Sequence, residues 1–79
     1  MTVQELNERL DDELKSLKEL VSRIKNEKFS SNFIFGVGMR DTLCELIDTR
    51  ARIGVLRQML FDYGVSVTFN QDFTATYFD

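Results

Sequence analysis

The chain has 79 residues, 43% of them hydrophobic, and its 10 basic and 13 acidic side chains give a net charge of -3. Its content of aromatic and β-branched residues excludes a disordered protein. One cysteine and no histidine exclude an internal disulfide and a Cys/His zinc site. We expect one small domain over residues 1–79, with no cofactor or metal. The charged N-terminus matches neither a signal peptide nor a membrane span, so we expect a cytoplasmic protein.

The first predicted element is a helix over residues 3–28. Apolar residues recur there at spacings of three and four, which is typical of one face of a helix. They are Val3, Leu6, Leu10, Leu14, Leu17, Leu20, Val21 and Ile24. Thr2 stands three residues before Glu5, as in a capping box. Acidic residues in the first half and basic residues in the second complement the helix dipole.

A second helix is predicted over residues 42–63. Thr42 has Glu45 three residues later, and Gly64 is a typical residue just beyond a helix. The main apolar stripe of this helix comprises Leu43, Leu46, Ile47, Ile53, Leu56, Leu60 and Phe61. A second apolar row, Val55, Met59 and Tyr63, lies on nearly the opposite side. A helix that is apolar on two sides needs two coverings, and the first helix supplies only one.

The stretch at residues 33–38, FIFGVG, is too short for periodicity to separate a third strand from a loop or an extra helical turn. Its Gly36-Val37-Gly38 resembles the start of a dinucleotide-binding fingerprint. That fingerprint needs a third glycine three residues later, where this chain has Asp41. We therefore interpret the two glycines as a corner that leads the chain into the second helix.

The C-terminal segment predicts a β-hairpin over residues 65–78. VSVTF and FTATYF both alternate apolar and polar residues, and the polar residues 70–72 connect them. The apolar face is expected to hold Val65, Val67, Phe69, Phe73, Ala75 and Tyr77. A lone hairpin is marginally stable, so this face must pack on something. We expect it to cover the row of Val55, Met59 and Tyr63.

The predicted fold class is therefore α+β. A long antiparallel two-helix unit, about 3–28 and 42–63, is followed by a C-terminal β-hairpin, about 65–78, packed on the second helix. Self-association as a homodimer is expected to cover the apolar surface that the hairpin leaves exposed.

Arg50 and Arg57 lie seven residues apart within the main stripe of the second helix. A buried charge needs a partner, and antiparallel pairing places Arg57 opposite Glu13, so we expect an ion pair between them. Arg50 would extend outward along its methylene groups. Alternatively, both arginines bind a carboxylate-rich or phosphate-bearing partner.

The acidic cluster near the N-terminus also has two interpretations. Its members are Glu8, Asp11, Asp12 and Glu13. Consecutive helical positions fan outward and make a poor metal site, so a solvated helix start is favoured over a partner-facing acidic patch.

Catalysis has little support in this sequence. There is no histidine to act as a base near neutral pH, and no serine or cysteine has a recognisable activating neighbour. Cys44 is expected in the first turn of the second helix, as a small buried or half-buried residue among acids. We predict that the protein is not an enzyme.

The favoured function is a small protein-binding module, an adaptor or an inhibitor of the kind that phages make, which acts on a larger protein through a helical surface. The alternative is a nucleic-acid-binding regulator that uses Arg40, Arg50, Arg52 and Arg57, but the acidic balance makes nucleic acid a poor partner. No membrane partner is expected. The candidate partner-binding residues are Arg50, Arg57, Val55, Met59, Tyr63, Asp11 and Asp12.

Overall fold

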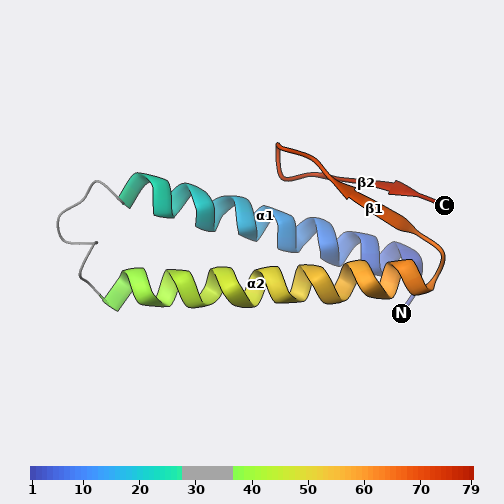
Figure 1. Ribbon diagram of the computed structural model, residues 1–79, viewed down its shortest axis with the longest axis horizontal. Coiled ribbons are helices and arrows are strands. Elements are labelled where there is room, and N and C mark those ends of the chain that lie inside the picture. Colours follow the sequence, from blue (N-terminus) through green and yellow to red (C-terminus); the bar gives the residue numbers. More distant parts are fainter. Residues whose placement is uncertain (28–36) are drawn as a thin grey trace.

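The computed structural model describes residues 1–27 and 37–79, and its fold is α+β, as predicted (Figure 1). Two long helices, α1 (Val3–Glu27) and α2 (Val37–Asp62), pack antiparallel. A two-stranded hairpin of β1 (Ser66–Phe69) and β2 (Ala75–Phe78) follows α2. Both helices run along the long axis of a molecule that measures 47 × 20 × 14 Å.

Helix α1 begins where its capping signal predicts. The Thr2 Oγ1 atom accepts a hydrogen bond from the Glu5 backbone N–H at 3.1 Å, and the Thr2 hydroxyl donates to Glu5 Oε1 at 3.2 Å. These contacts satisfy one of the N–H groups that the first turn of a helix leaves unpaired. All eight residues of the predicted apolar stripe are buried or half-buried. The prediction of this helix is confirmed.

Helix α2 begins at Val37, five residues before the predicted start at residue 42. Thr42 is therefore not a cap but a buried residue on the inner face, with 4% of its surface exposed. A Thr-x-x-Glu spacing does not distinguish a helix start from a position inside a helix, which explains the error. Gly38 lies in the first turn of α2. Residues 33–36 of the glycine-containing stretch lie outside the described residues.

The inner face of α2 is narrower than the predicted stripe. Its central positions alternate in steps of four and three and are buried or half-buried; they are Thr42, Leu46, Thr49, Ile53, Leu56 and Leu60, and half-buried Met59 lies beside them. Leu43, Ile47 and Phe61 were predicted to belong to this stripe, but they are 40%, 66% and 64% exposed. At 100° per residue these three turn away from α1, so the predicted stripe combined two different faces of the helix.

The end of α2 matches the prediction in detail. Gly64 has a φ of 86°, a conformation that side chains with a Cβ disfavour. The Gly64 N–H donates to the Phe61 carbonyl and the Val65 N–H donates to the Leu60 carbonyl, both at 2.9 Å. This is a Schellman motif, and the packing of Val65 near Leu60 in the core is its usual hydrophobic contact. The motif turns the chain from α2 into β1.

The hairpin has the predicted strands and a slightly shifted connection. Val67 pairs with Tyr77 and Phe69 with Ala75. The Asn70 N–H donates to the Thr74 carbonyl at 2.9 Å, so the connection is residues 71–73 rather than 70–72. Phe73 closes it with a φ of 62°. A left-handed third residue is typical of three-residue hairpin loops, although a residue as bulky as phenylalanine is rare there.

The hairpin packs on the two-helix unit through Val65 and Val67, which are 5% and 4% exposed. They share a core cluster with leucines of both helices, Leu6, Leu10, Leu14, Leu56 and Leu60, and with Ile53. The expected cover over Val55 and Tyr63 is absent, because these residues remain 59% and 58% exposed, and only Met59 is half-buried. The strands pack on the leucine-rich side of both helices, where more apolar surface can be removed from water.

Candidate protein-binding surface

A groove of about 530 Å³ runs between the two helices, and we call it the open groove. No hairpin residue lines it. Its lining comes from α1 and α2 together with Met1, and the residues are Met1, Arg9, Asp12, Glu13, Ala51, Arg52, Val55, Leu56 and Met59. The open groove therefore presents the two-helix surface that the chain does not cover with its own strands.

The floor and one wall of the open groove are apolar. Leu56 is buried beneath it, Met59 is half-buried, and Val55 and Met1 are 59% and 49% exposed. Val55 and Met59 lie one helical turn apart on α2, so their side chains are neighbours on the same side. A cluster of this kind, rimmed by charged residues, is the usual form of a surface that binds another protein.

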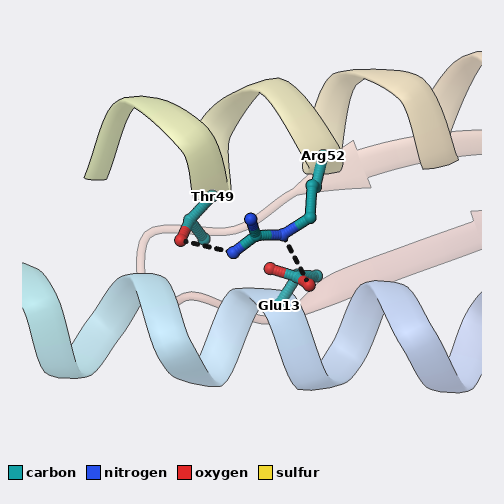
Figure 2. Close-up of polar contacts among 3 residues, drawn as sticks. All are labelled: Glu13, Thr49 and Arg52. Atoms are coloured by element: carbon teal, nitrogen blue, oxygen red, sulfur yellow. Dashed lines mark hydrogen bonds and ion pairs between the residues drawn. The ribbon is translucent and has the colours of Figure 1, made fainter. Parts of the chain in front are cut away.

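Two residues that line the open groove, Glu13 and Arg52, form an ion pair between α1 and α2 (Figure 2). The Arg52 Nε–H on α2 donates to Glu13 Oε1 on α1 at 2.9 Å, and Nη2 donates to Thr49 Oγ1 at 3.1 Å. Thr49 is buried on the inner face of α2, and its hydroxyl oxygen holds the guanidinium of Arg52 in place. The second carboxylate oxygen of Glu13, Oε2, is buried and has no hydrogen-bond partner among the described residues. The contact between Arg52 and Glu13 joins the helices at mid-length.

The predicted pair between Arg57 and Glu13 is therefore wrong, because Arg52 occupies that place. Arg57 instead lies over the ring of Phe69 in β1, 5.0 Å from the ring centre. A cation above an aromatic face is attracted by the negative face of the ring. Arg50 and Arg57 line a separate hollow of about 360 Å³ beside the hairpin loop, together with Phe69 and Phe73. The two arginines lie together, as expected from their spacing, but away from the open groove.

Asp11 forms a polar contact between α1 and the hairpin. The Tyr77 hydroxyl lies 2.7 Å from Asp11 Oδ1 and 3.1 Å from the carbonyl oxygen of Asn7. Burial, the hydrogen bond to Asp11 and the charge of that carboxylate raise the pKa of Tyr77 above its ordinary value of 10.0. The tyrosine therefore stays protonated and donates a hydrogen bond that fixes β2 on α1.

The seven predicted partner-binding residues are thus divided among separate places. Val55, Met59 and Asp12 meet in the open groove. Arg50 and Arg57 lie beside the hairpin, and Asp11 contacts Tyr77. Tyr63 is exposed just beyond the end of α2. The sequence indicated Arg52 only for the nucleic-acid alternative and did not predict its pairing with Glu13, because the buried Thr49 that also binds its guanidinium could not be recognised from the helical pattern.

Two further predictions concern reactive groups. Cys44 is exposed rather than buried, and it lies two turns inside α2 rather than in its first turn. The acidic cluster does not converge, because Asp11 faces Tyr77, Asp12 lines the open groove and Glu13 binds Arg52. Within the described ranges, 1–27 and 37–79, no three His, Cys, Asp or Glu side chains gather in a way that could hold a metal ion.

Comparison with protein-family models, with curated proteins and with solved structures found no match to this chain. Neither α1 nor the described part of α2 has the length and hydropathy that crossing a membrane requires. The candidate surface therefore rests on the geometry of the molecule itself.

Proposed function

We propose that the protein is a small non-enzymatic protein-binding module, an adaptor or an inhibitor, that binds a larger protein through the open groove. The observation that carries the proposal is the apolar row of exposed Val55 and half-buried Met59 along a groove of about 530 Å³. A cytoplasmic location is part of the proposal, since the single cysteine has no partner within the chain.

The shape and charges of the open groove indicate the kind of segment that would fit. A partner helix or extended segment would insert apolar side chains between α1 and α2, over Leu56 and Met59. Arg9 and Asp12 on α1 would pair with charged residues at the edge of that segment. Such rim charges contribute mainly to the rate and the specificity of binding, whereas the apolar contacts provide most of the affinity.

A photo-crosslinking residue placed at Val55 of the full-length chain tests this proposal in extracts of the native host. The matched control carries the same residue at Ser22, which is exposed on α1 away from the groove. We expect a defined protein to be captured from position 55 and not from position 22. The captured protein is then purified, and its dissociation constant is measured directly.

The purified pair should bind saturably, and Val55→Glu should raise Kd about tenfold or more, because a charge replaces an apolar contact. Ser22→Glu should leave Kd unchanged. Equal binding by wild type and Val55→Glu would exclude the open groove as the site.

The alternative of a nucleic-acid-binding regulator draws less support from the structure. Of the four arginines it would use, Arg52 is paired with Glu13 and Arg57 lies over Phe69. A phosphate-binding protein must bind generic DNA or RNA at low salt and lose affinity as salt rises. A gel-shift titration at about 20 and about 200 mM salt, roughly one decade of ionic strength, should show no such complex.

A further inference from the structure

Helix α2 carries a second heptad seam, on the side that faces away from α1. Its positions again alternate in steps of three and four, and they are Cys44, Ile47, Ala51, Gly54, Gln58 and Phe61. We call this set the outer face. All six residues are exposed, Ile47 at 66% and Phe61 at 64%. No described part of the chain covers them.

Repeated steps of three and four are the pattern by which one helix packs along another. The inner face of α2 has the same pattern and packs on α1, whereas the outer face has no partner within the described residues. The centre of the outer face is small, because its two middle positions are Ala51 and Gly54. A Cβ added at Gly54 would meet no atom of the described residues within 4 Å, so the space above it is open. Two large residues, Ile47 and Phe61, border this shallow centre one heptad away on each side.

The charges beside the outer face have opposite signs on its two flanks. Arg50 and Arg57 follow the flank beside the hairpin. Asp48 and Asp62 follow the opposite flank, and all four side chains are exposed. A face with one basic and one acidic flank is complementary to a second copy of itself when the two helices run parallel, because a two-fold axis along the helix brings unlike flanks together.

In that parallel arrangement, Arg57 lies opposite Asp62 of the second copy, and the symmetry repeats the contact. These positions are five residues apart, which is the spacing of the salt bridges that flank a parallel two-stranded coiled coil. An antiparallel arrangement centred on Gly54 would instead bring Arg50 close to Arg57 of the second copy, and like charges repel. It would also place both hairpins on the same side of the interface.

We propose that the protein forms a parallel homodimer through the outer face of α2, with Ile47 packed on Ile47 and Phe61 on Phe61 of the second copy. The two α1 helices and the two hairpins then lie on the outside of the pair. The outer face shares Ala51 with the open groove, but Ile47 and Phe61 do not line that groove. Variants at Ile47 therefore test the dimer apart from the proposed function.

Sedimentation equilibrium of the full-length chain at micromolar concentrations tests the assembly. We expect twice the chain mass of 9.2 kDa. Ile47→Asp should raise the dimer dissociation constant about tenfold or more, because it places a charge at the centre of an apolar contact. Phe78→Asp is the matched control, since Phe78 is 52% exposed on the hairpin, and it should leave the dimer intact. Circular dichroism confirms that both variants are folded.

The orientation is tested by the single cysteine. In a parallel dimer, the two Cys44 thiols face each other, so mild copper-catalysed oxidation by air should join two chains through one disulfide. In an antiparallel dimer, the thiols lie near opposite ends of the interface and cannot meet. Asp62→Arg should weaken the dimer, and Arg57→Asp combined with Asp62→Arg should restore it.

Three outcomes would overturn the proposal. The first is a monomer mass at all micromolar concentrations. The second is a dimer that Ile47→Asp and Phe78→Asp affect equally. The third is a dimer that yields no Cys44 disulfide under oxidation. If Val55→Glu abolishes partner binding while the dimer persists, the two surfaces are separate, and each proposal has been tested by itself.

Discussion

The two helices of this protein have similar lengths but differ in how their surfaces are used. Helix α1 has one apolar stripe, which is covered by α2 and the hairpin, and its remaining residues are polar or charged. Helix α2 has a buried stripe of the same kind but also exposes Leu43, Ile47 and Phe61. Packing within the chain explains the positions of the apolar residues of α1. It explains only the buried stripe of α2 and leaves the exposed apolar residues of that helix unexplained. Exposed apolar residues that no contact within the chain explains are typical of binding surfaces.

The largest expected effect contrasts the two faces of α2 at adjacent positions. Leu60 is fully buried and Phe61 is 64% exposed. Leu60→Ala should lower the free energy of unfolding by about 2–5 kcal/mol, because it leaves a cavity in the core. Phe61→Ala should change it by less than about 0.5 kcal/mol.

Urea unfolding of both variants in the Ile47→Asp background measures these values without a contribution from association. A large loss for Phe61→Ala in that background would mean that the outer face is stabilised within a single chain, and the comparison between the helices would fail.

The second prediction concerns the turn that directs the hairpin from α2 toward α1. Gly64 has a φ of 86°, so Gly64→Ala should destabilise the fold by about 1 kcal/mol or more. Asparagine tolerates this conformation better than alanine does, so Gly64→Asn should lose less. Thermal melts of the two variants give the order. If Gly64→Ala and Gly64→Asn lower the melting temperature equally, the loss comes from adding a side chain at residue 64 and not from its backbone angle.

The third prediction concerns the contact by which α1 binds the hairpin. Tyr77→Phe removes the hydroxyl bonded to Asp11 and should lower stability by about 1 kcal/mol, a value reduced for partial exposure. The pKa of Tyr77 is raised in the folded state. Its stabilising effect is therefore fully present below pH 10, the ordinary tyrosine value, and declines as the pH rises above it.

Stability measured between pH 8 and 11, roughly the range around the ordinary tyrosine pKa, should fall for the wild type. It should fall less steeply for Tyr77→Phe. Parallel curves would show that this hydroxyl does not link α1 to β2 in solution.

The smallest effect tests the ion pair between the helices. Arg52 is 55% and Glu13 24% exposed at the side chain, so the coupling of Arg52→Met and Glu13→Gln should be about 0.2–1 kcal/mol. The matched cycle with Arg57→Met should be additive, because Arg57 contacts Phe69 instead. Coupling between Arg57→Met and Glu13→Gln would instead support the ion pair between Arg57 and Glu13 that the sequence predicted.

The sequence predicted those parts of the fold that depend on local rules. The cap at Thr2, the stripe of α1, the turn at Gly64 and the alternation of the strands each depend on residues within a few positions of one another. The start of α2 was misplaced by five residues, because Thr42 and Glu45 have the spacing of a cap inside a helix.

The parts that could not be predicted depend on contacts between distant segments. Whether Glu13 meets Arg52 or Arg57 depends on the rotation and register of α1 against α2, which neither helix encodes alone. Thr49 appeared polar in the sequence and is 2% exposed in the structure. The hairpin packs beside Leu6 and Leu10 rather than over Val55. Of the seven predicted partner-binding residues, only Val55, Met59 and Asp12 line the open groove, and whether they bind a partner stays a prediction.

The elongated shape has a consequence for motion in solution. The molecule measures 47 × 20 × 14 Å, so it rotates faster about its long axis than end over end. Both helices run along that axis (Figure 1). Backbone N–H bonds lie parallel to the axis of a helix and perpendicular to a strand, so helix and strand amides are oriented differently. Nitrogen-15 relaxation should therefore differ between helix and strand amides in a free chain. Side-by-side pairing along α2 thickens the rod without lengthening it, so this difference should shrink as the protein concentration rises.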